Sequence, residues 1–337
     1  MSRFCGAFLG IGFVACCLAG AIEPVLYPQL MEIPAGFPAI APPSDNAFLL
    51  ERWLLGKKLF FDPVMSSDSS ISCASCHRPE LAFSDNQAIS PGVAQRPGNR
   101  NVPSLANVAY HPYFTREGGV PTLEMQVLVP IQEHHEFDFN IILLAQRLVN
   151  DSMYVAMAQK AYQRAPDPFV ITRALACFER SLLSGNSPYD QFTFQGKKKA
   201  LSAAQKRGMK LFYSKKTNCS TCHSGFNFTN YAFENNGLYT SYRDEGRFRL
   251  TRNPADSALF KIPSLRNVAI TAPYMHDGSL HSLRAVIEHY ESGGKSHPQK
   301  SSAIQPLELT EREKNDLLAF LESLTDESFI QNPLFTN

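Results

Sequence analysis

Two short stretches of the chain place two cysteines and a histidine in the order CxxCH. They are Cys73, Cys76 and His77 in ISCASCHRPELAFSD, and Cys219, Cys222 and His223 in NCSTCHSG. Two thiols at this spacing can add to the two vinyl groups of a heme, and the adjacent histidine then binds the iron. The pattern therefore predicts two covalently bound heme c groups, with His77 and His223 as their proximal ligands.

Zinc and a redox-active dithiol are the alternatives for such cysteine pairs. A structural zinc site would pool the two pairs into one tetrahedral centre, yet each pair has its own histidine and the pairs lie far apart in the chain. A thioredoxin-like dithiol needs a βαβ setting, and the sequence around the pairs offers none. Neither alternative explains the two histidines, so covalent heme is favoured.

The sequences around the two CxxCH segments, which we call the first and second clip, repeat in the same order. ERWLLGKKLFFDP precedes the first clip and AQKRGMKLFYSKK the second, while NVPSLANVAYHPYF (101–114) is matched downstream by KIPSLRNVAITAPY (261–274). Such self-similarity predicts two copies of one unit, related by duplication. We place a linker in SGNSPYDQFTFQGKKKALS (184–202), with the boundary near Gln195. The expected parts are a signal peptide (1–21), an N-terminal heme domain (22–195) and a C-terminal heme domain (196–337).

The periodicity of apolar residues predicts an all-α fold of cytochrome c-like helical domains with long loops. Segments with a period near 3.6 are 45–60, 121–131, 138–162, 167–183, 201–212, 281–291 and 310–324. Thr310 followed by Glu313 forms a capping box that opens the last of them. Alternation typical of strands is scarce. Long loops rich in Pro and Gly, between helices, suit a domain that surrounds a flat cofactor.

The charge balance and the N-terminus bear on partners and location. The 337 residues carry a net charge of +1, which gives no indication of nucleic acid or an anionic membrane as partner. The N-terminus, MSRFCGAFLGIGFVACCLAGA, is typical of a secretory signal cleaved near Ala21; a signal anchor, or a lipid on Cys16 or Cys17, is the alternative. The signal leads us to expect a periplasmic location, and no later segment is long and apolar enough to span a bilayer. Cys177, the cysteine outside both clips of the mature chain, is interpreted as a buried packing thiol.

These motifs together resemble the bacterial diheme cytochrome c peroxidase family, which includes MauG-type enzymes that oxidise protein residues. The resemblance runs from about Leu49 to Thr325. It is carried by KKLFFDP, CASCHRPELAFSD, RNVPSLANVAY, TLEMQ, KLF, CSTCH, FKIPSLRNVAITAPYMHDGSL and HYESGG. It implies two helical heme domains, a first heme that reacts with peroxide, a six-coordinate second heme and a calcium ion between them.

The far side of the first heme is expected to be open. Classical family members carry a histidine in the loop after the first clip, but residues 78–110 contain neither His nor Met. The resemblance makes Gln126 and Glu136 the distal residues, with the carboxylate moving the proton of peroxide and the amide holding it. The alternative is that both are ordinary surface residues. The neighbouring His134 and His135 lack a third metal ligand at suitable spacing, so we interpret them as part of a solvated turn.

Two residues compete for the sixth position of the second heme, Met275 in TAPYMHDG and Tyr290 in IEHYESGG. The family's axial Met or Tyr follows a T-x-P motif at a spacing that matches Tyr290, which we favour. A phenolate stabilises Fe(III) and higher states, whereas a thioether raises the potential. The resemblance also implies Asn101, Thr271 and Pro273 as calcium ligands; as an alternative, they are ordinary turn residues.

One departure from the family concerns the path between the hemes. Most members carry a Trp in a WDGR motif, whereas the ungapped match here begins at Arg116 and reads REGG (116–119). The chain has a single Trp, Trp53, for which we expect a core position. Tyr110, Tyr113 and Phe114 are substitutes for the bridging residue, and direct tunnelling is the other route.

The sequence therefore predicts a periplasmic diheme peroxidase that reduces hydrogen peroxide with electrons from a small cytochrome c or a cupredoxin. A first alternative is MauG-like oxidation of residues in a partner protein, favoured by the missing distal His and by Tyr290. A second alternative is a diheme electron carrier, against which the open heme and Glu136 both argue. Dimers are common in the family, so a homodimer is compatible with the resemblance.

Overall fold

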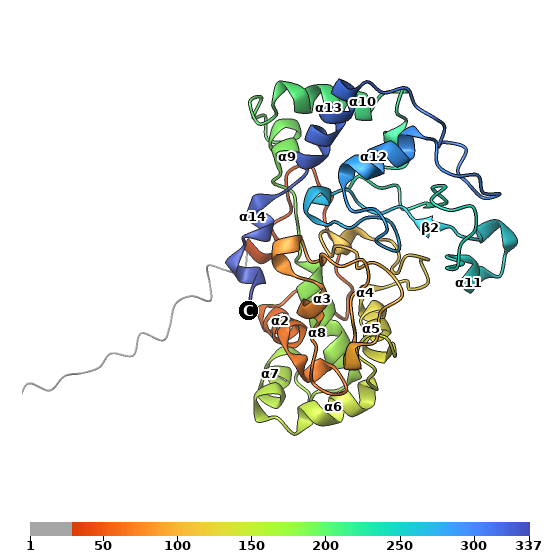
Figure 1. Ribbon diagram of the computed structural model, residues 1–337. Helices are drawn as coiled ribbons and strands as arrows, with labels where there is room; N and C mark the ends of the chain where they lie inside the picture. The colour runs from red at the N-terminus through yellow and green to blue at the C-terminus, as the bar shows by residue number, and fades with distance from the viewer. Residues whose placement is uncertain (1–28) are drawn as a thin grey trace, which may run out of the picture. The chain divides into compact units, whose positions relative to one another are not determined.

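The computed structural model describes residues 29–337, so the predicted signal peptide and its cleavage point lie outside the described residues (Figure 1). Ile33–Asn337 forms one compact unit. Residues 29–32 belong to a separate unit and hold the 3₁₀ turn η1 (Gln29–Met31). The proposed division near Gln195 stays a prediction.

The compact unit is rich in helix. Its α-helices are α2 (Leu50–Phe61), α3 (Cys73–Cys76), α4 (Leu123–Gln126), α5 (Leu128–Gln132), α6 (Ile141–Val149), α7 (Ser152–Tyr162), α8 (Pro168–Arg180), α9 (Pro188–Thr193), α10 (Ala203–Phe212), α11 (Phe248–Thr251), α12 (Leu283–Glu291), α13 (Glu311–Glu322) and α14 (Glu327–Ile330). Among the described residues the extended structure comprises one antiparallel pair, β1 (Phe233–Glu234) and β2 (Phe260–Lys261), in which Phe233 pairs with Lys261.

Short 3₁₀ turns punctuate the loops between these helices. They are η2 (Pro63–Met65), η3 (Pro79–Leu81), η4 (Val93–Gln95), η5 (Val108–Tyr110), η6 (Cys219–Thr221), η7 (Pro254–Asp256), η8 (Val268–Ile270) and η9 (Pro333–Phe335). The helix-rich architecture confirms the predicted class, with long irregular loops around the clips. None of the helices in residues 29–337 has the length and apolar character needed to cross a membrane.

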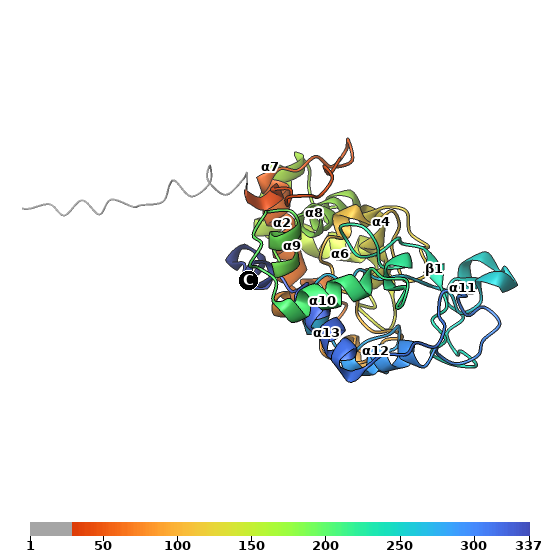
Figure 2. The same ribbon diagram turned by 90° about the horizontal axis from the view of Figure 1, so that it is seen from above.

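Each clip is preceded by a helix that packs closely on a later helix (Figures 1 and 2). In the first half α2 crosses α8 at Gly56, where a Cβ atom would lie 1.9 Å from the carbonyl oxygen of Ala174. In the second half α10 crosses α13 at Gly208, where a Cβ atom would lie 1.8 Å from the carbonyl oxygen of Asp316. Both glycines begin the G-x-K-L-F stretch that the sequence repeats, and only a residue without Cβ allows the helices this close.

Aromatic side chains fill the space next to each helix pair. Phe60, Phe83 and Phe178 meet in the first half, with ring centroids 5.0 to 6.4 Å apart. Phe212, Phe228 and Phe320 do the same in the second half, at 5.1 to 6.3 Å. Trp53 is buried and donates from Nε1 to Ser181 Oγ at 2.8 Å, and Cys177 is buried too. The core positions predicted for these two residues are confirmed.

Two of the predicted helices are broken in the structure. The segment 138–162 contains α6 and α7, because α6 ends at Val149 and the Asp151 side chain caps a new helix by accepting from Met153 N. The segment 121–131 contains α4 and α5, which meet at Val127. Pro130 lacks the N–H that would continue the ladder there. The Thr310–Glu313 capping box is present as predicted.

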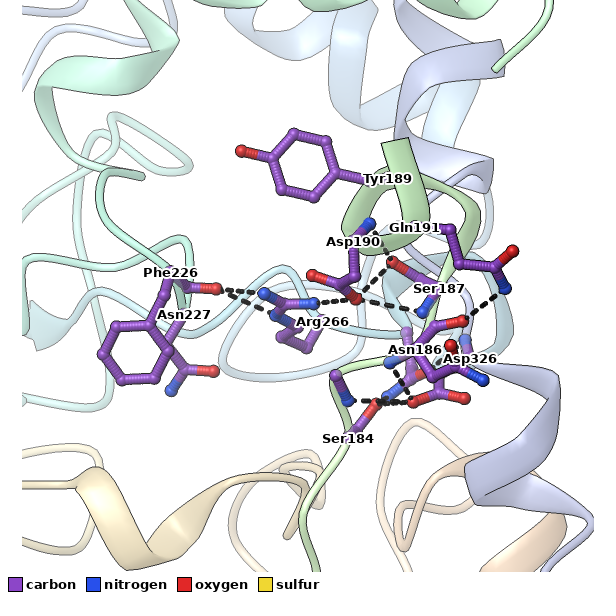
Figure 3. Close-up of polar contacts among 12 residues, drawn as sticks. Ser184, Asn186, Ser187, Tyr189, Asp190, Gln191, Phe226, Asn227, Arg266 and Asp326 are labelled. Atoms are coloured by element: carbon purple, nitrogen blue, oxygen red, sulfur yellow. Dashed lines mark hydrogen bonds and ion pairs between the residues drawn. The ribbon is translucent and has the colours of Figure 1, made fainter. Parts of the chain in front are cut away.

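The first part of the predicted linker is buried and firmly held (Figure 3). The Asp326 carboxylate accepts from the backbone N–H groups of Gly185 and Asn186 at 2.9 and 2.8 Å. Asp190 forms a fully buried ion pair with Arg266 at 2.5 Å. The exposed, linker-like stretch is therefore confined to 196–199, since the residues before it join segments from both halves of the chain.

Candidate active site

The first clip is a short capped helix. Ser72 and Ser75 form a capping box at the start of α3, and the His77 N–H bonds to the Cys73 carbonyl at 2.9 Å. The His77 Nδ1 lies 2.7 Å from the Phe83 carbonyl oxygen. Since a carbonyl only accepts, Nδ1 carries the hydrogen, and the lone pair is on Nε2, the atom that a metal would take.

The second clip has the same design. The His223 N–H bonds to the Cys219 carbonyl at 3.0 Å, and its Nδ1 donates to the Phe228 carbonyl at 3.0 Å. Burial lowers the pKa of both histidines, although the carbonyls of Pro103 and Pro263 oppose the shift at His77 and His223 respectively. These prolines stand at matching places in the repeated PSL motifs. Both imidazoles are therefore held neutral in the tautomer that suits an axial ligand.

A cavity of about 430 Å³ extends from the second clip towards residues of the first half. Its wall is mainly apolar and includes Cys219, Cys222 and His223. Three buried polar atoms on this wall have no hydrogen-bond partner: His111 Nε2, Arg116 Nε and Gln126 Oε1. A heme combines an apolar macrocycle with two carboxylates, so the wall suits it. Free thiols at both clips and two available Nε2 atoms complete the requirements for covalent heme.

Gln126 and Glu136 lie on one continuous segment, α4–α5 and the turn that follows. Gln126 lines the cavity. Burial raises the pKa of the Cys73 and Cys76 thiols, and the Glu136 carboxylate contributes to the shift at both, which puts it within electrostatic reach of the first clip. Glu136 is exposed, as the surface-residue alternative expected, yet the protein packed close to the carboxyl raises its pKa to about 7, with a further contribution from Glu133.

The turn that carries Glu136 is clamped against the loop after the first clip. Val93 N donates to the Glu136 carbonyl at 2.9 Å, and Arg96 bonds to the His134 carbonyl and to Asp138 at 2.8 and 2.7 Å. The His134 side chain is 62% exposed and pairs with Asp138. His135 contacts the Pro97 carbonyl at 2.9 Å. The exposed His134 agrees with the predicted solvated turn, and the clamp fixes the backbone at Glu136.

Met275 and Tyr290 meet at the same residue. Asn236 Nδ2 donates to Met275 Sδ at 3.1 Å, and the Asn236 side chain also lies close enough to the Tyr290 hydroxyl to oppose the effect of burial on its pKa. Both side chains line the cavity with the second clip. Burial raises the pKa of Tyr290 to about 12. The structure thus brings both competing ligands to this cavity, and the preference for Tyr290 stays a prediction.

The three residues expected to hold calcium also line the cavity. Asn101 is buried, but its main-chain oxygen accepts from Arg116 Nη2 at 2.7 Å and its Oδ1 lies 3.4 Å from the same nitrogen. A guanidinium therefore lies at the oxygens that a calcium ion would need from Asn101. Thr271 and Pro273 lie on the same wall.

Three residues absent from the predicted site face the same cavity. Burial raises the pKa of Glu179 to about 8 against the opposing charge of Arg180. Burial lowers the pKa of His111 to about 3, with help from Lys261, whose own pKa falls to about 8. Glu179 could have been predicted, because it lies among the buried residues of α8, which run with one gap from Val170 to Arg180. The sequence holds no local signal for His111 or Lys261, which meet through the tertiary fold.

Comparison with known proteins matches this geometry to a family. Residues 51–199 match the model of the di-haem cytochrome c peroxidases, and residues 205–325 match that of cytochrome c. The methylamine utilization protein MauG of Methylorubrum extorquens is 38% identical over 85% of this chain and 81% of its own. The chain belongs to the diheme cytochrome c peroxidase/MauG family. Two heme c groups are the cofactors that these models imply, and the chain is an oxidoreductase of a family that acts on peroxide.

Other members of the family extend the likeness. The cytochrome-c peroxidase IdrP1 of a Pseudomonas species is 33% identical over 95% of this chain and 90% of its own. A MauG-like protein associated with microbial copper homeostasis has a similar structure, with a TM-score of 0.86, 33% identity and coverage of 90% of this chain and 98% of that one. The diheme peroxidase BthA of Burkholderia thailandensis, at 22% identity and a TM-score of 0.72, shares the fold.

Proposed function

We propose that this chain is a periplasmic enzyme that consumes hydrogen peroxide at the His77 site and takes two electrons from residues of a partner protein. The observation that carries the proposal is the carboxyl of Glu136 within electrostatic reach of the first clip, beside a loop that offers no His or Met. The likeness to MauG supports the choice of a protein substrate.

A heme at His77 would supply the iron that binds peroxide and accepts oxidising equivalents. The chain's own residues would handle protons and position. With a pKa of about 7, the Glu136 carboxyl can both accept a proton from peroxide and return it to the departing oxygen at neutral pH. The unpartnered Gln126 Oε1 can accept a hydrogen bond from the peroxide. The balance is one peroxide, two protons and two electrons to two waters.

At the second clip, the residues would tune electron transfer. His223 and Tyr290 would hold the heme there, with the Asn236 side chain close to the Tyr290 hydroxyl. An anionic oxygen ligand stabilises an oxidised iron, so this site would store an oxidising equivalent until the partner protein supplies electrons. Met275 would then pack beside the heme, held through its contact with Asn236.

A second candidate is a peroxidase supplied with electrons by a small cytochrome c or a cupredoxin. It is favoured by the match to the cytochrome-c peroxidase IdrP1 over 95% of this chain. The two candidates share the peroxide chemistry at His77 and differ in the source of the electrons.

Peroxide consumption by the ferric holoprotein tests both candidates. The first predicts a rapid optical change on adding peroxide without prior reduction, and slow steady consumption when reduced cytochrome c or cupredoxin is the donor. Rapid steady turnover with either donor would favour the second candidate. A ferric holoprotein that shows no reaction with peroxide would contradict both.

A further inference from the structure

Arg116 is a half-buried cation without an ion-pair partner. Its Nη2 donates to the main-chain oxygen of Asn101, whereas its Nε is buried and has no partner. Within residues 29–337, no carboxylate oxygen lies within 4.0 Å of an Arg116 guanidinium nitrogen, which is the distance limit for an ion pair. Burial lowers the pKa of Arg116 to about 10, so the guanidinium stays charged at neutral pH. A charge partly removed from water and without an ion-pair partner needs acceptor oxygens, and Asn101 provides them.

Two of the carboxylates nearby are already engaged by another arginine. Arg100 pairs with Asp244 through two bonds of 2.6 and 2.8 Å, and it also pairs with Glu117. A further cation, Lys261, lies nearby: burial lowers its pKa, and the charge of Arg116 contributes to the shift. The surroundings of Asn101 therefore already contain fixed positive charge. Glu117 and Asp244 are engaged by Arg100, and the third acid near Arg116, Asp277, accepts a hydrogen bond from the Tyr239 hydroxyl at 2.6 Å.

These contacts do not fit a calcium ion at Asn101. Calcium takes six to eight oxygen ligands at about 2.3–2.6 Å, and both Asn101 oxygens face the guanidinium. Thr271 and Pro273 line the same cavity as Arg116. A dication bound by all three residues would lie next to the guanidinium, where like charges repel strongly in a buried site.

We infer that the Arg116 guanidinium is the resident cation at the Asn101 oxygens and that the protein binds no calcium there. The position that carries the family's Trp thus supplies a permanent charge in place of an exchangeable ion. The fold around Asn101 then depends on a side chain and is insensitive to the supply of calcium.

The test is made on the heme-loaded protein and uses calcium itself as the probe. Wild-type protein, passed through gel filtration in calcium buffer, should carry no stoichiometric calcium by elemental analysis, and EGTA should leave its melting temperature unchanged. Arg116→Gln should melt lower without calcium and gain about 3 °C when calcium is added in excess of its Kd. Lys261→Gln is the control: it removes a neighbouring cation that does not contact Asn101, and it should stay insensitive to calcium.

Either of two results would overturn the inference. One is stoichiometric calcium in the wild type with a melting temperature that falls in EGTA, which requires no variant to fold. The other is an Arg116→Gln protein that is as stable as the wild type and does not respond to calcium, because the guanidinium would then not stand in place of a calcium ion at Asn101. Arg116→Lys, which keeps the charge, should resist calcium as the wild type does.

Discussion

The histidines of the two clips make the same hydrogen bond through Nδ1, but the residues further from each imidazole differ. Each Nδ1 donates to the carbonyl of a phenylalanine, Phe83 or Phe228, in the loop that follows. Near the first clip lies the Glu136 carboxyl, whereas Met275 and Tyr290 line the cavity at the second. The clips thus prepare two equivalent metal ligands, and the neighbours decide which site handles protons and which supplies a second ligand.

Replacement of Glu136 tests the proton step. Glu136→Gln cannot accept a proton, so the reaction of the ferric protein with peroxide should slow about 10²- to 10⁴-fold in stopped-flow, with heme content unchanged. In the wild type the base form grows as pH rises through the pKa of about 7. The rate should therefore rise with pH over this range and level off above it, and the variant should lose this dependence.

Glu133→Gln is the matched control for that experiment. The Glu133 charge contributes to the raised pKa of Glu136, so removing it should move the midpoint of the rate profile to lower pH and preserve the plateau rate. If Glu136→Gln reacts as fast as this control, Glu136 is not the group that moves the proton.

The sixth ligand of the second heme is tested by two substitutions. Tyr290→Phe removes the hydroxyl that contacts Asn236, and it should change the low-spin absorption and EPR signals if the phenol binds iron. Met275→Leu removes the thioether and should leave those signals close to the wild type. The reverse pattern, a change in Met275→Leu alone, would make Met275 the ligand.

At the scale of helices, two close crossings hold the framework around the clips. Gly56 on α2 touches the backbone of α8, and Gly208 on α10 touches that of α13. Each crossing lies at the glycine that begins the repeated G-x-K-L-F sequence. This supports the predicted duplication, although the duplication itself remains a prediction. Since the clip follows each of these helices, the spacing of the pair fixes where the clip begins.

Gly56→Ala tests the α2–α8 crossing. In an exposed helix this change stabilises by about 0.5–1 kcal/mol, but here the new Cβ would overlap the Ala174 carbonyl. Overpacking of this kind costs about 1–3 kcal/mol, so the melting temperature should fall. Leu54 lies on the same helix and is 39% exposed, so Leu54→Ala is the control and should change the melting temperature little. A melting temperature at or above the wild type in Gly56→Ala would contradict the tight crossing.

Local patterns predicted the helices well where local forces decide them. The Thr310–Glu313 box and the apolar stripe of α8 are examples, since neighbours in sequence make both. The break between α6 and α7 was missed because apolar periodicity continues across Asn150 and Asp151, and the Asp151 cap outweighs it. In the site, the spacing of CxxCH determined the clips, but Arg116 and His111 are brought to the cavity by contacts distant in sequence.

At the scale of the whole compact unit, the halves meet at a shared polar centre (Figure 3). Asn107 and Asn267, which occupy matching places in the repeated motifs, both hydrogen-bond to Ser184. Asp326 N donates to Asn267, while the Asp326 carboxylate accepts from Ser184. The composition of 184–202 suggested a free linker, because Ser, Gly and Pro are typical of exposed loops. The same residues here satisfy buried partners, and composition cannot distinguish the two cases.

The central claim is an iron at His77 with an open face beside Glu136, paired with a second iron that has ligands on both faces. EPR of the as-isolated ferric holoprotein tests it most directly. The account predicts one high-spin signal, from the five-coordinate heme at His77, and one low-spin signal from the heme at His223. Two low-spin signals would contradict it, since both irons would then be six-coordinate, as in a protein that only carries electrons.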